Sequence, residues 1–243
     1  MHAEEYARMF ELEDHYWWFV GRRRVALRLL RSATASTKRP LVLDLGCGTG
    51  VISRELREWA SPVSLDMSEL ALRFSRERGL KNLVQARGEW LPIRSASVDA
   101  VLALDIFEHI KDHEAAFREA YRVLKPGGVL VLSVPAFRSL WGPHDVALMH
   151  FRRYTRGWMR RVLSSAGFQI VRLSYSVFFL FPLVVLVRLV EKAKRGEAKA
   201  SLPQVPEWAN KALIQLQELE SALIARSSLP WGSSVIAVAS KES

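Results

Sequence analysis

The stretch VLDLGCGTG, residues 42–50, constrains the fold of this chain more than any other feature of its sequence. Its apolar residues carry one acid, Asp44, and then give way to Gly46, Gly48 and Gly50. Such an apolar run is typical of a buried strand, and the glycines let backbone N–H groups approach a ligand closely. Because ligands bind beyond the carboxyl ends of the strands in open parallel sheets, the stretch predicts a ligand site directly after the first strand.

Strand-like and helix-like segments alternate along the rest of the chain. The predicted strands span 41–46, 62–66, 82–86, 98–105, 129–135, 168–176 and 234–240. The helices predicted between them span 50–59, 68–79, 112–124 and 155–167. Ser68, Asp112 and Thr155 are predicted to be N-caps. Strands separated by helices imply right-handed βαβ units, and therefore an α/β fold with a mostly parallel sheet.

About fifty residues separate the last two predicted strands, which is far longer than a hairpin loop. One helix is expected to start at Pro182 and to carry the apolar run VFFLFPLVVLV. A second helix is expected over 206–226, with four leucines on one face: Leu213, Leu216, Leu219 and Leu223. The expected organisation is an aromatic helical cap (1–39), a ligand-binding core (40–176), a helical insertion (177–231) and a final core strand (232–243).

Composition bounds the class of protein. Hydrophobic residues make up 49% of the 243 residues, which excludes a disordered chain. The net charge of +10 suits an anionic partner, such as nucleic acid, lipid headgroups or an acidic substrate. The single Cys47 forms no internal disulfide, the N-terminal residues do not resemble a signal peptide, and no apolar run reaches the ~18 residues of a membrane span. We therefore expect a cytoplasmic protein, with peripheral contact at the inner membrane surface as a further hypothesis.

Two nucleotide-like ligands compete for the glycine loop. A dinucleotide site has the pattern G-x-G-x-x-G/A, whereas this chain has G-x-G-x-G with Val51 at the later position. Asp44 would repel a pyrophosphate, but it suits a ligand with an ammonium group. S-adenosylmethionine has an ammonium group and no phosphate, and Asp66 at the end of the second strand is placed to accept both ribose hydroxyls. The loop is therefore predicted to bind S-adenosylmethionine, with Met67 against the adenine.

With LDLGCGTG (43–50), LPIRSASVD (91–99) and LKPGG (124–128), the chain resembles the class I S-adenosylmethionine-dependent methyltransferases, in particular their small-molecule, type 11-like group. The resemblance covers about residues 40–175 and the last strand. It implies an enzyme with a Rossmann-like seven-stranded sheet, mostly parallel with the last strand antiparallel, and helices on both faces. It also implies S-adenosyl-L-methionine as cofactor and S-adenosyl-L-homocysteine as product.

The resemblance assigns cofactor contacts residue by residue. The methionine part falls to Gly46, Cys47, Gly48 and Thr49, the ribose to Asp66, and the adenine to Met67, Gly88 and Glu89. The family often has an acid before the position of Gly88, whereas this chain has Arg87, which cannot accept a hydrogen bond from the adenine amino group.

Two further segments are expected near the methionine end of the cofactor. Leu104 and Asp105 end the fourth predicted strand, at the ligand-binding edge. In related methyltransferases an aromatic N-terminal segment similar to residues 15–24 folds over the cofactor. The resemblance therefore implies that Trp18 touches the pocket, and that one of the three arginines at 22–24 meets the methionine carboxylate.

Asp105, Glu108 and His109 are the first candidates for acting on the methyl acceptor, since they share one face if this turn is helical. We predict that His109, with these carboxylates, acts as a base or orients the acceptor. A divalent metal on the same three residues, as the resemblance to quinone-precursor O-methyltransferases suggests, is the less favoured alternative.

A second candidate cluster follows the fifth predicted strand. His144 and His150 are further catalytic candidates, and Arg152 and Arg153 are predicted to clamp an anionic group of the acceptor.

The favoured hypothesis is an S-adenosylmethionine-dependent O-methyltransferase that acts on a small or lipid-linked acceptor. RNA or protein methylation, motivated by the charge of +10, and a non-catalytic cofactor-binding subunit are the alternatives. No NPPY-type motif and no appended nucleic-acid module are found, so no nucleic-acid partner is favoured. In the insertion, aromatic and aliphatic residues are followed by basic ones: Phe178, Phe179, Phe181 and Leu183, then Arg188, Lys192, Lys194 and Arg195. This order fits a helix that lies on an anionic membrane, and it fits equally a lid that encloses an apolar acceptor. The remaining alternative is that the insertion only packs on the sheet.

Overall fold

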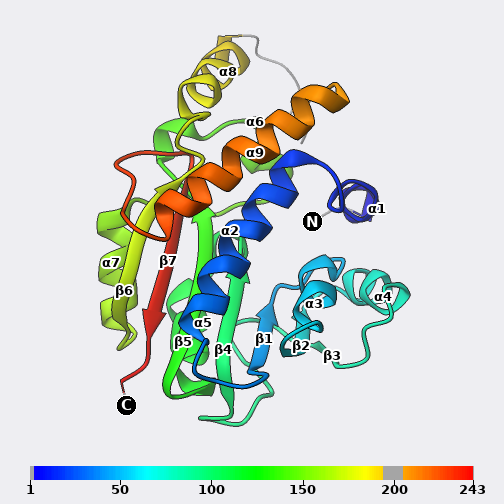
Figure 1. Cartoon of the computed structure of the whole chain (residues 1–243), viewed down its shortest axis with the longest axis vertical. Coiled ribbons are helices and arrows are strands. Elements are labelled where there is room, and N and C mark those ends of the chain that lie inside the picture. The colour runs from blue at the N-terminus through cyan, green and yellow to red at the C-terminus, as the bar shows by residue number, and fades with distance from the viewer. Residues whose placement is uncertain (1–2, 194–204, 243) are drawn as a thin grey trace.

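One seven-stranded sheet runs through the protein, in a computed structural model that describes residues 3–193 and 205–242 (Figure 1). The strands are β1 (Leu41–Leu45), β2 (Ser61–Asp66), β3 (Leu83–Gln85), β4 (Val98–Leu104), β5 (Leu124–Pro135), β6 (Gln169–Ser176) and β7 (Ser234–Ser240). Their order across the sheet is β3-β2-β1-β4-β5-β7-β6. Strands β1 to β5 all run parallel to one another, and β7 pairs antiparallel with β5 and β6. The predicted Rossmann-like sheet with an antiparallel last strand is therefore confirmed.

Helices cover both faces of this sheet. They are α1 (Ala3–Leu12), α2 (Trp17–Ala33), α3 (Val51–Leu56), α4 (Glu69–Glu77), α5 (His113–Val123), α6 (Pro143–Ala147), α7 (Arg156–Ser165), α8 (Phe181–Ala193) and α9 (Glu207–Ile224), with 3-10 turns η1 (Phe107–His109) and η2 (Arg138–Leu140). Leu43 lies in a core with Phe117 of α5, whereas Val42 lies in a second core with Leu30 of α2. Successive strand residues point to opposite faces, and both faces are covered, which explains the uninterrupted apolar sequence of β1.

The N-caps predicted at Ser68, Asp112 and Thr155 are confirmed, because each side chain accepts a backbone N–H three residues later. The helix predicted over 50–59 ends at Leu56. Beyond it, the N–H groups of Glu58 and Trp59 bond to carbonyls three residues earlier, whereas an α-helix bonds to carbonyls four residues earlier.

The fifth strand begins at Leu124 rather than at Val129, so the KPGG segment belongs to the strand instead of following the helix as a turn. The backbone of Gly127 and Gly128 pairs with that of Lys241, which follows the last strand, and this pairing extends the sheet. The partner lies more than a hundred residues away, so no local pattern could indicate it.

The insertion before β7 contains α8 and α9, and residues 194–204 between them lie outside the described part of the chain. Helix α9 packs across α2 at Gly21, where a Cβ would lie 1.8 Å from Gln217 Oε1. Because this polar side of α9 faces the protein, Leu219 and Leu223 on the predicted leucine face are exposed. Of the described helices, none combines the length and apolar character that crossing a bilayer requires.

Candidate functional site

The glycine loop, residues 46–50, follows β1 directly and is hydrogen-bonded to the carboxyl end of β2. Gly46 and Gly48 have positive φ angles of 74° and 54°, which favour glycine. A Cβ on Gly46 would lie 2.6 Å from the Ile106 side chain, so this position has no room for one. Gly46 N–H and Cys47 N–H both donate to the carbonyl of Leu65 in β2. The loop is therefore held by backbone bonds, and the buried thiol of Cys47 has its pKa raised by burial, which suits a packing role.

Asp66 lies at the end of β2 with its carboxylate turned toward this loop. One oxygen accepts Gly48 N–H at 3.0 Å, and the other accepts Ser68 N–H at 2.8 Å. Burial outweighs these bonds and raises the pKa of the carboxyl above its ordinary value. Each carboxylate oxygen has two lone pairs, so both retain one for a further donor such as a ribose hydroxyl. The neighbouring Met67 is exposed at the edge of the site.

Asp44 is buried at the carboxyl end of β1 and accepts the Ser53 hydroxyl at 2.7 Å. Burial raises the pKa of Asp44 to about 7, and the nearby carboxylates of Asp66 and Glu13 add to this shift. A cationic group of a ligand beside Asp44 would favour the ionised carboxylate.

The contribution of Asp44 to the stability of the unliganded protein is expected to fall as the pH rises from about 4 to about 7, because native Asp44 then keeps a proton that the unfolded chain has released. Asp44→Asn keeps an acceptor for Ser53 but does not titrate. The free energy of unfolding of this variant, measured with urea across the same pH range, should rise relative to that of the unaltered protein as the pH increases. Parallel curves would contradict the assignment to Asp44.

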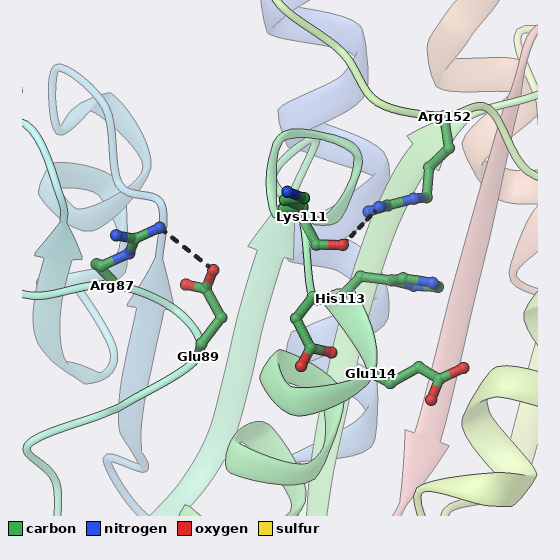
Figure 2. A pocket seen from close by; sticks show the side chains of 7 residues that line it. Arg87, Glu89, Lys111, His113, Glu114 and Arg152 are labelled. Carbon is green, nitrogen blue, oxygen red and sulfur yellow. Dashed lines mark hydrogen bonds and ion pairs between the residues drawn. The ribbon is translucent and has the colours of Figure 1, made fainter.

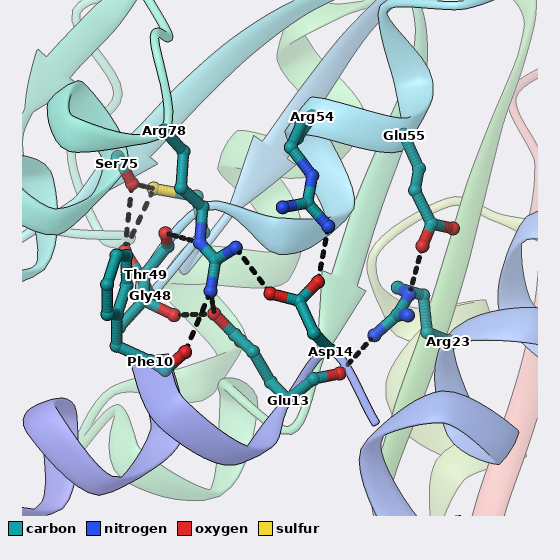
Figure 3. Close-up of polar contacts among 11 residues, drawn as sticks. Phe10, Glu13, Asp14, Arg23, Gly48, Thr49, Arg54, Glu55, Ser75 and Arg78 are labelled. Atoms are coloured by element: carbon teal, nitrogen blue, oxygen red, sulfur yellow. Dashed lines mark hydrogen bonds and ion pairs between the residues drawn. The ribbon is translucent and has the colours of Figure 1, made fainter. Parts of the chain in front are cut away.

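Helix α1 and the turn after it lie directly over the glycine loop (Figure 3). Glu13 accepts the Thr49 hydroxyl and forms a buried ion pair with Arg78 at 2.8 Å. The Met9 side chain lies 3.5 Å from where a Cβ on Gly48 would be. The predicted contact of Thr49 with a cofactor therefore competes with its present bond to Glu13.

Next to Glu89, one of the residues predicted to lie near the adenine, an open hollow of about 570 Å³ is lined by seven residues: Arg87, Glu89, Lys111, Asp112, His113, Glu114 and Arg152 (Figure 2). Arg87 lies 3.6 Å from Glu89, so the arginine that replaces the family's acid pairs with the next acid along the chain. A Cβ on Gly88 would lie 2.6 Å from Ile110 Cδ1, which explains a glycine here.

Asp105 follows Leu104 at the end of β4 and accepts hydrogen bonds from the Arg22 guanidinium and the Ser133 hydroxyl. Burial would raise the pKa of Asp105, but Arg22 and Ser133 outweigh it and hold the pKa below its ordinary value. Trp18, one turn before Arg22 on α2, lines a small cavity beside this pair. Of the three adjacent arginines, Arg22 is thus the one at the predicted site.

The other two arginines of this run pair elsewhere. Arg23 pairs with Glu55 at 2.7 Å and donates to the Glu13 carbonyl (Figure 3). Arg24 pairs with Glu218 of α9 at 2.8 Å.

Of the predicted group of Asp105, Glu108 and His109, the last two share a cluster of candidate ligand atoms and Asp105 has a separate partner. Asp105 has a positive φ of 52° and lies outside the 3-10 turn, where it pairs with Arg22. Instead His150 joins Glu108 and His109, and their candidate ligand atoms lie within 4.8 Å of one another. The less favoured divalent-metal alternative would therefore use these three residues, whose two imidazoles and one carboxylate are a fitting donor set.

Glu108 is fully buried, and neither of its carboxyl oxygens has a hydrogen-bond partner within the described structure. Burial raises its pKa well above the ordinary value, and Asp105 adds to the shift. Burial also lowers the pKa of His109 to about 4, so this imidazole is neutral at neutral pH.

His150 is held by Asp145, a neighbour in the same sequence cluster for which no role was predicted. Its Nδ1 lies 2.9 Å from Asp145 Oδ1, and Arg153 binds both oxygens of that carboxylate at 2.8 and 3.0 Å. Burial would raise the pKa of Asp145, but the bonds from His150 and Arg153 hold it well below its ordinary range. An ionised Asp145 fixes the proton on Nδ1 and leaves Nε2 of His150 as an acceptor. The pairing connects Asp145 in the short helix α6 with His150 in the segment that follows it, so no periodicity indicated it.

The two arginines of the predicted clamp both have partners within the protein. Arg153 pairs with Asp145, and Arg152 donates to three backbone carbonyls around η1: Phe107, Ile110 and Lys111. His144 lies beside His150, with ring centroids 6.4 Å apart, and burial lowers its pKa to about 4. The loop thus orients His150 through Asp145, and Arg152 lines the open hollow while it binds the backbone around η1.

Comparison with known proteins finds similarity to methyltransferases. A profile described as "Methyltransferase domain" matches residues 43–132. A "Probable S-adenosylmethionine-dependent methyltransferase" of Mycolicibacterium smegmatis is 30% identical over 65% of this chain and 61% of its own length. The ubiquinone biosynthesis O-methyltransferase of Xanthomonas oryzae is 30% identical over 54% of this chain and 61% of its own. Each match spans less than two thirds of the relative.

Among solved structures, a chain of the Haloferax volcanii complex that contains the Trm112 methyltransferase activator has the same fold. It aligns with a TM-score of 0.63 over 98% of this chain and 95% of that one, at 17% identity. At this identity the likeness concerns the fold alone.

Proposed function

Since the chain belongs to the class I S-adenosylmethionine-dependent methyltransferase family, we propose that it transfers a methyl group from S-adenosylmethionine to an oxygen atom of a small or lipid-linked acceptor. The observation that carries the proposal is that the glycine loop and a cluster of acid and histidine side chains lie at the same edge of the sheet. The glycine loop with Asp66 lies at the ends of β1 and β2, and the cluster of Glu108, His109 and His150 lies beyond β4 and β5.

The residues around the loop fit the cofactor. Asp66 retains acceptor capacity for the ribose, Gly46 and Gly48 carry no side chain of their own on the loop, and Asp44 suits a cationic group. When bound, S-adenosylmethionine supplies an electrophilic methyl group on a sulfonium. The chain's own part is to hold the acceptor in line with that methyl group and to exclude water.

His150 is proposed as the general base that takes the acceptor's proton. Its Nε2 is free to accept because Nδ1 is fixed by Asp145. A base is needed when the acceptor is a hydroxyl, since a neutral hydroxyl is a weak nucleophile until it loses its proton. The relative named for O-methylation in ubiquinone biosynthesis supports oxygen as the methylated atom.

The test is to incubate the protein with methyl-labelled S-adenosylmethionine and host lysate, and to separate lipid, polar metabolites, RNA and protein. Label in lipid or polar metabolites, dependent on the protein, is the expected result. Label in RNA or protein would replace the acceptor class but keep the cofactor assignment. No labelled product in any fraction, together with tight cofactor binding, would favour a non-catalytic subunit.

A further inference from the structure

A row of exposed aliphatic side chains runs along one side of α8. Leu183, Leu186, Val187 and Val190 recur every three or four residues, so they share one face, which we call the outer face of α8. Leu183 is 56% exposed and Leu186 is 58% exposed. Contiguous exposed apolar side chains of this kind mark interaction surfaces in folded proteins.

The base of α8 is firmly attached, so this exposure is a property of a fixed element. The Glu220 carboxylate of α9 accepts the backbone N–H groups of Val177, Phe178 and Phe179. The ring of Phe181 packs against Phe137, with centroids 5.8 Å apart. Figure 1 shows α8 projecting beyond the sheet, at the end toward which β4 and β5 point.

The length and charge of α8 fit the surface of a bilayer. Thirteen residues extend about 20 Å as a helix, shorter than the ~30 Å hydrocarbon core, so the helix would lie in the plane of the interface. From Arg188 to Lys199 the sequence has five basic residues and two acidic ones, although those after Ala193 lie outside the described structure. Together with a net charge of +10, this composition complements anionic headgroups.

The outer face also adjoins the acceptor side of the site. Arg188 of α8 is close enough to His144 of α6 to contribute, after burial, to lowering the pKa of that histidine. Val146 in α6 and Met149 just after it have exposed side chains, and the next residue is His150. Apolar surface therefore occurs on both neighbouring segments at this end of the molecule.

We propose that the outer face of α8 docks on an anionic phospholipid bilayer and brings the His150 side of the site to the membrane surface. Delivery of a lipid-linked acceptor to that site rests on the proposed function, whereas docking itself does not require methyl transfer. The two can therefore fail independently, because docking is measured without cofactor or acceptor.

The test is co-sedimentation of the full chain with vesicles of phosphatidylcholine alone and of phosphatidylcholine mixed with phosphatidylglycerol. Binding to the anionic vesicles is expected, and Leu186→Glu should weaken it at least about tenfold by losing apolar burial. Val171→Glu is the matched control. It changes the net charge equally at an exposed position near the start of β6, away from α8, and should bind like the unaltered protein.

Three results would overturn the proposal. One is equal binding by the Leu186→Glu and Val171→Glu variants. Another is binding that high salt abolishes in every protein, since this would be a charge effect without apolar docking. The third is no vesicle binding at all. If gel filtration then showed that Leu186→Glu dissociates a dimer, the outer face would be an interface between copies of the chain.

Discussion

Asp66→Ala is expected to weaken the binding of S-adenosylmethionine at least about a hundredfold, because a hydrogen bond to a charged group contributes roughly 1.5–3 kcal/mol and the ribose offers two hydroxyls. The Asp66 carboxylate also accepts Gly48 N–H, so the variant frees the glycine loop from the end of β2. Both effects lower affinity at the same site. Calorimetric titration with S-adenosylmethionine and S-adenosylhomocysteine should show the loss for both ligands, since they share the ribose.

Asp99→Ala is the matched control for the loss of a carboxylate that binds the backbone. Asp99 accepts Leu41 N–H at 2.7 Å and pairs with Lys125 at 2.7 Å, but it lies at the amino end of β4, at the opposite edge of the sheet from the glycine loop. This variant should lower the free energy of unfolding and leave cofactor affinity unchanged. Unchanged affinity in Asp66→Ala would remove Asp66 from the cofactor site. Equal weakening in both variants would attribute the effect to lost stability.

The sheet could be predicted from the sequence because its signals are local. The caps at Ser68, Asp112 and Thr155 act three residues away, and the apolar run of β1 reports burial on both faces without any knowledge of the partners. The strand boundary that differs most from its prediction is the start of β5 at Leu124, which pairs with Val98 of β4, and the following glycines pair with the distant Lys241 backbone.

The site could be predicted only at the level of which strand ends carry it. Spacing placed Asp105 with Glu108 and His109, but a positive φ turns Asp105 out of the 3-10 turn toward Arg22. The Glu13 carboxylate that covers Thr49 comes from a different segment, 36 residues earlier, so helical periodicity says nothing about it. Side-chain pairing across loops is set by tertiary packing, and that is why the pairing of His150 with Asp145 and the cover of Glu13 over Thr49 required the structure.

His150→Ala is expected to lower kcat by about 10²–10⁴, the usual contribution of a positioned general base, while the affinity for S-adenosylmethionine stays unchanged. The physical reason is the tautomer of His150. Its Nδ1 lies 2.9 Å from Asp145 Oδ1 and keeps its proton, so Nε2 is left to take the proton of the methyl acceptor. Turnover with the acceptor fraction from the labelling experiment measures kcat, and titration measures the affinity. Added imidazole should restore part of the turnover, which it could not do if His150 only supported the loop.

Two further variants separate the base from the packing around it. His113→Ala removes another buried histidine, whose ring nitrogen lies 3.1 Å from the Tyr154 hydroxyl and takes no part in the cluster. Because His113 lines the open hollow, any loss in this variant should appear in cofactor affinity and not in kcat. Asp145→Asn keeps the shape of the orienting group but removes its charge, so Nδ1 loses its preference for the proton and kcat should fall without rescue by imidazole. A kcat that survives in His150→Ala would mean that the acceptor loses its proton without this imidazole. The cluster would then serve to position the acceptor, and Glu108 with His109 would be the groups to replace next.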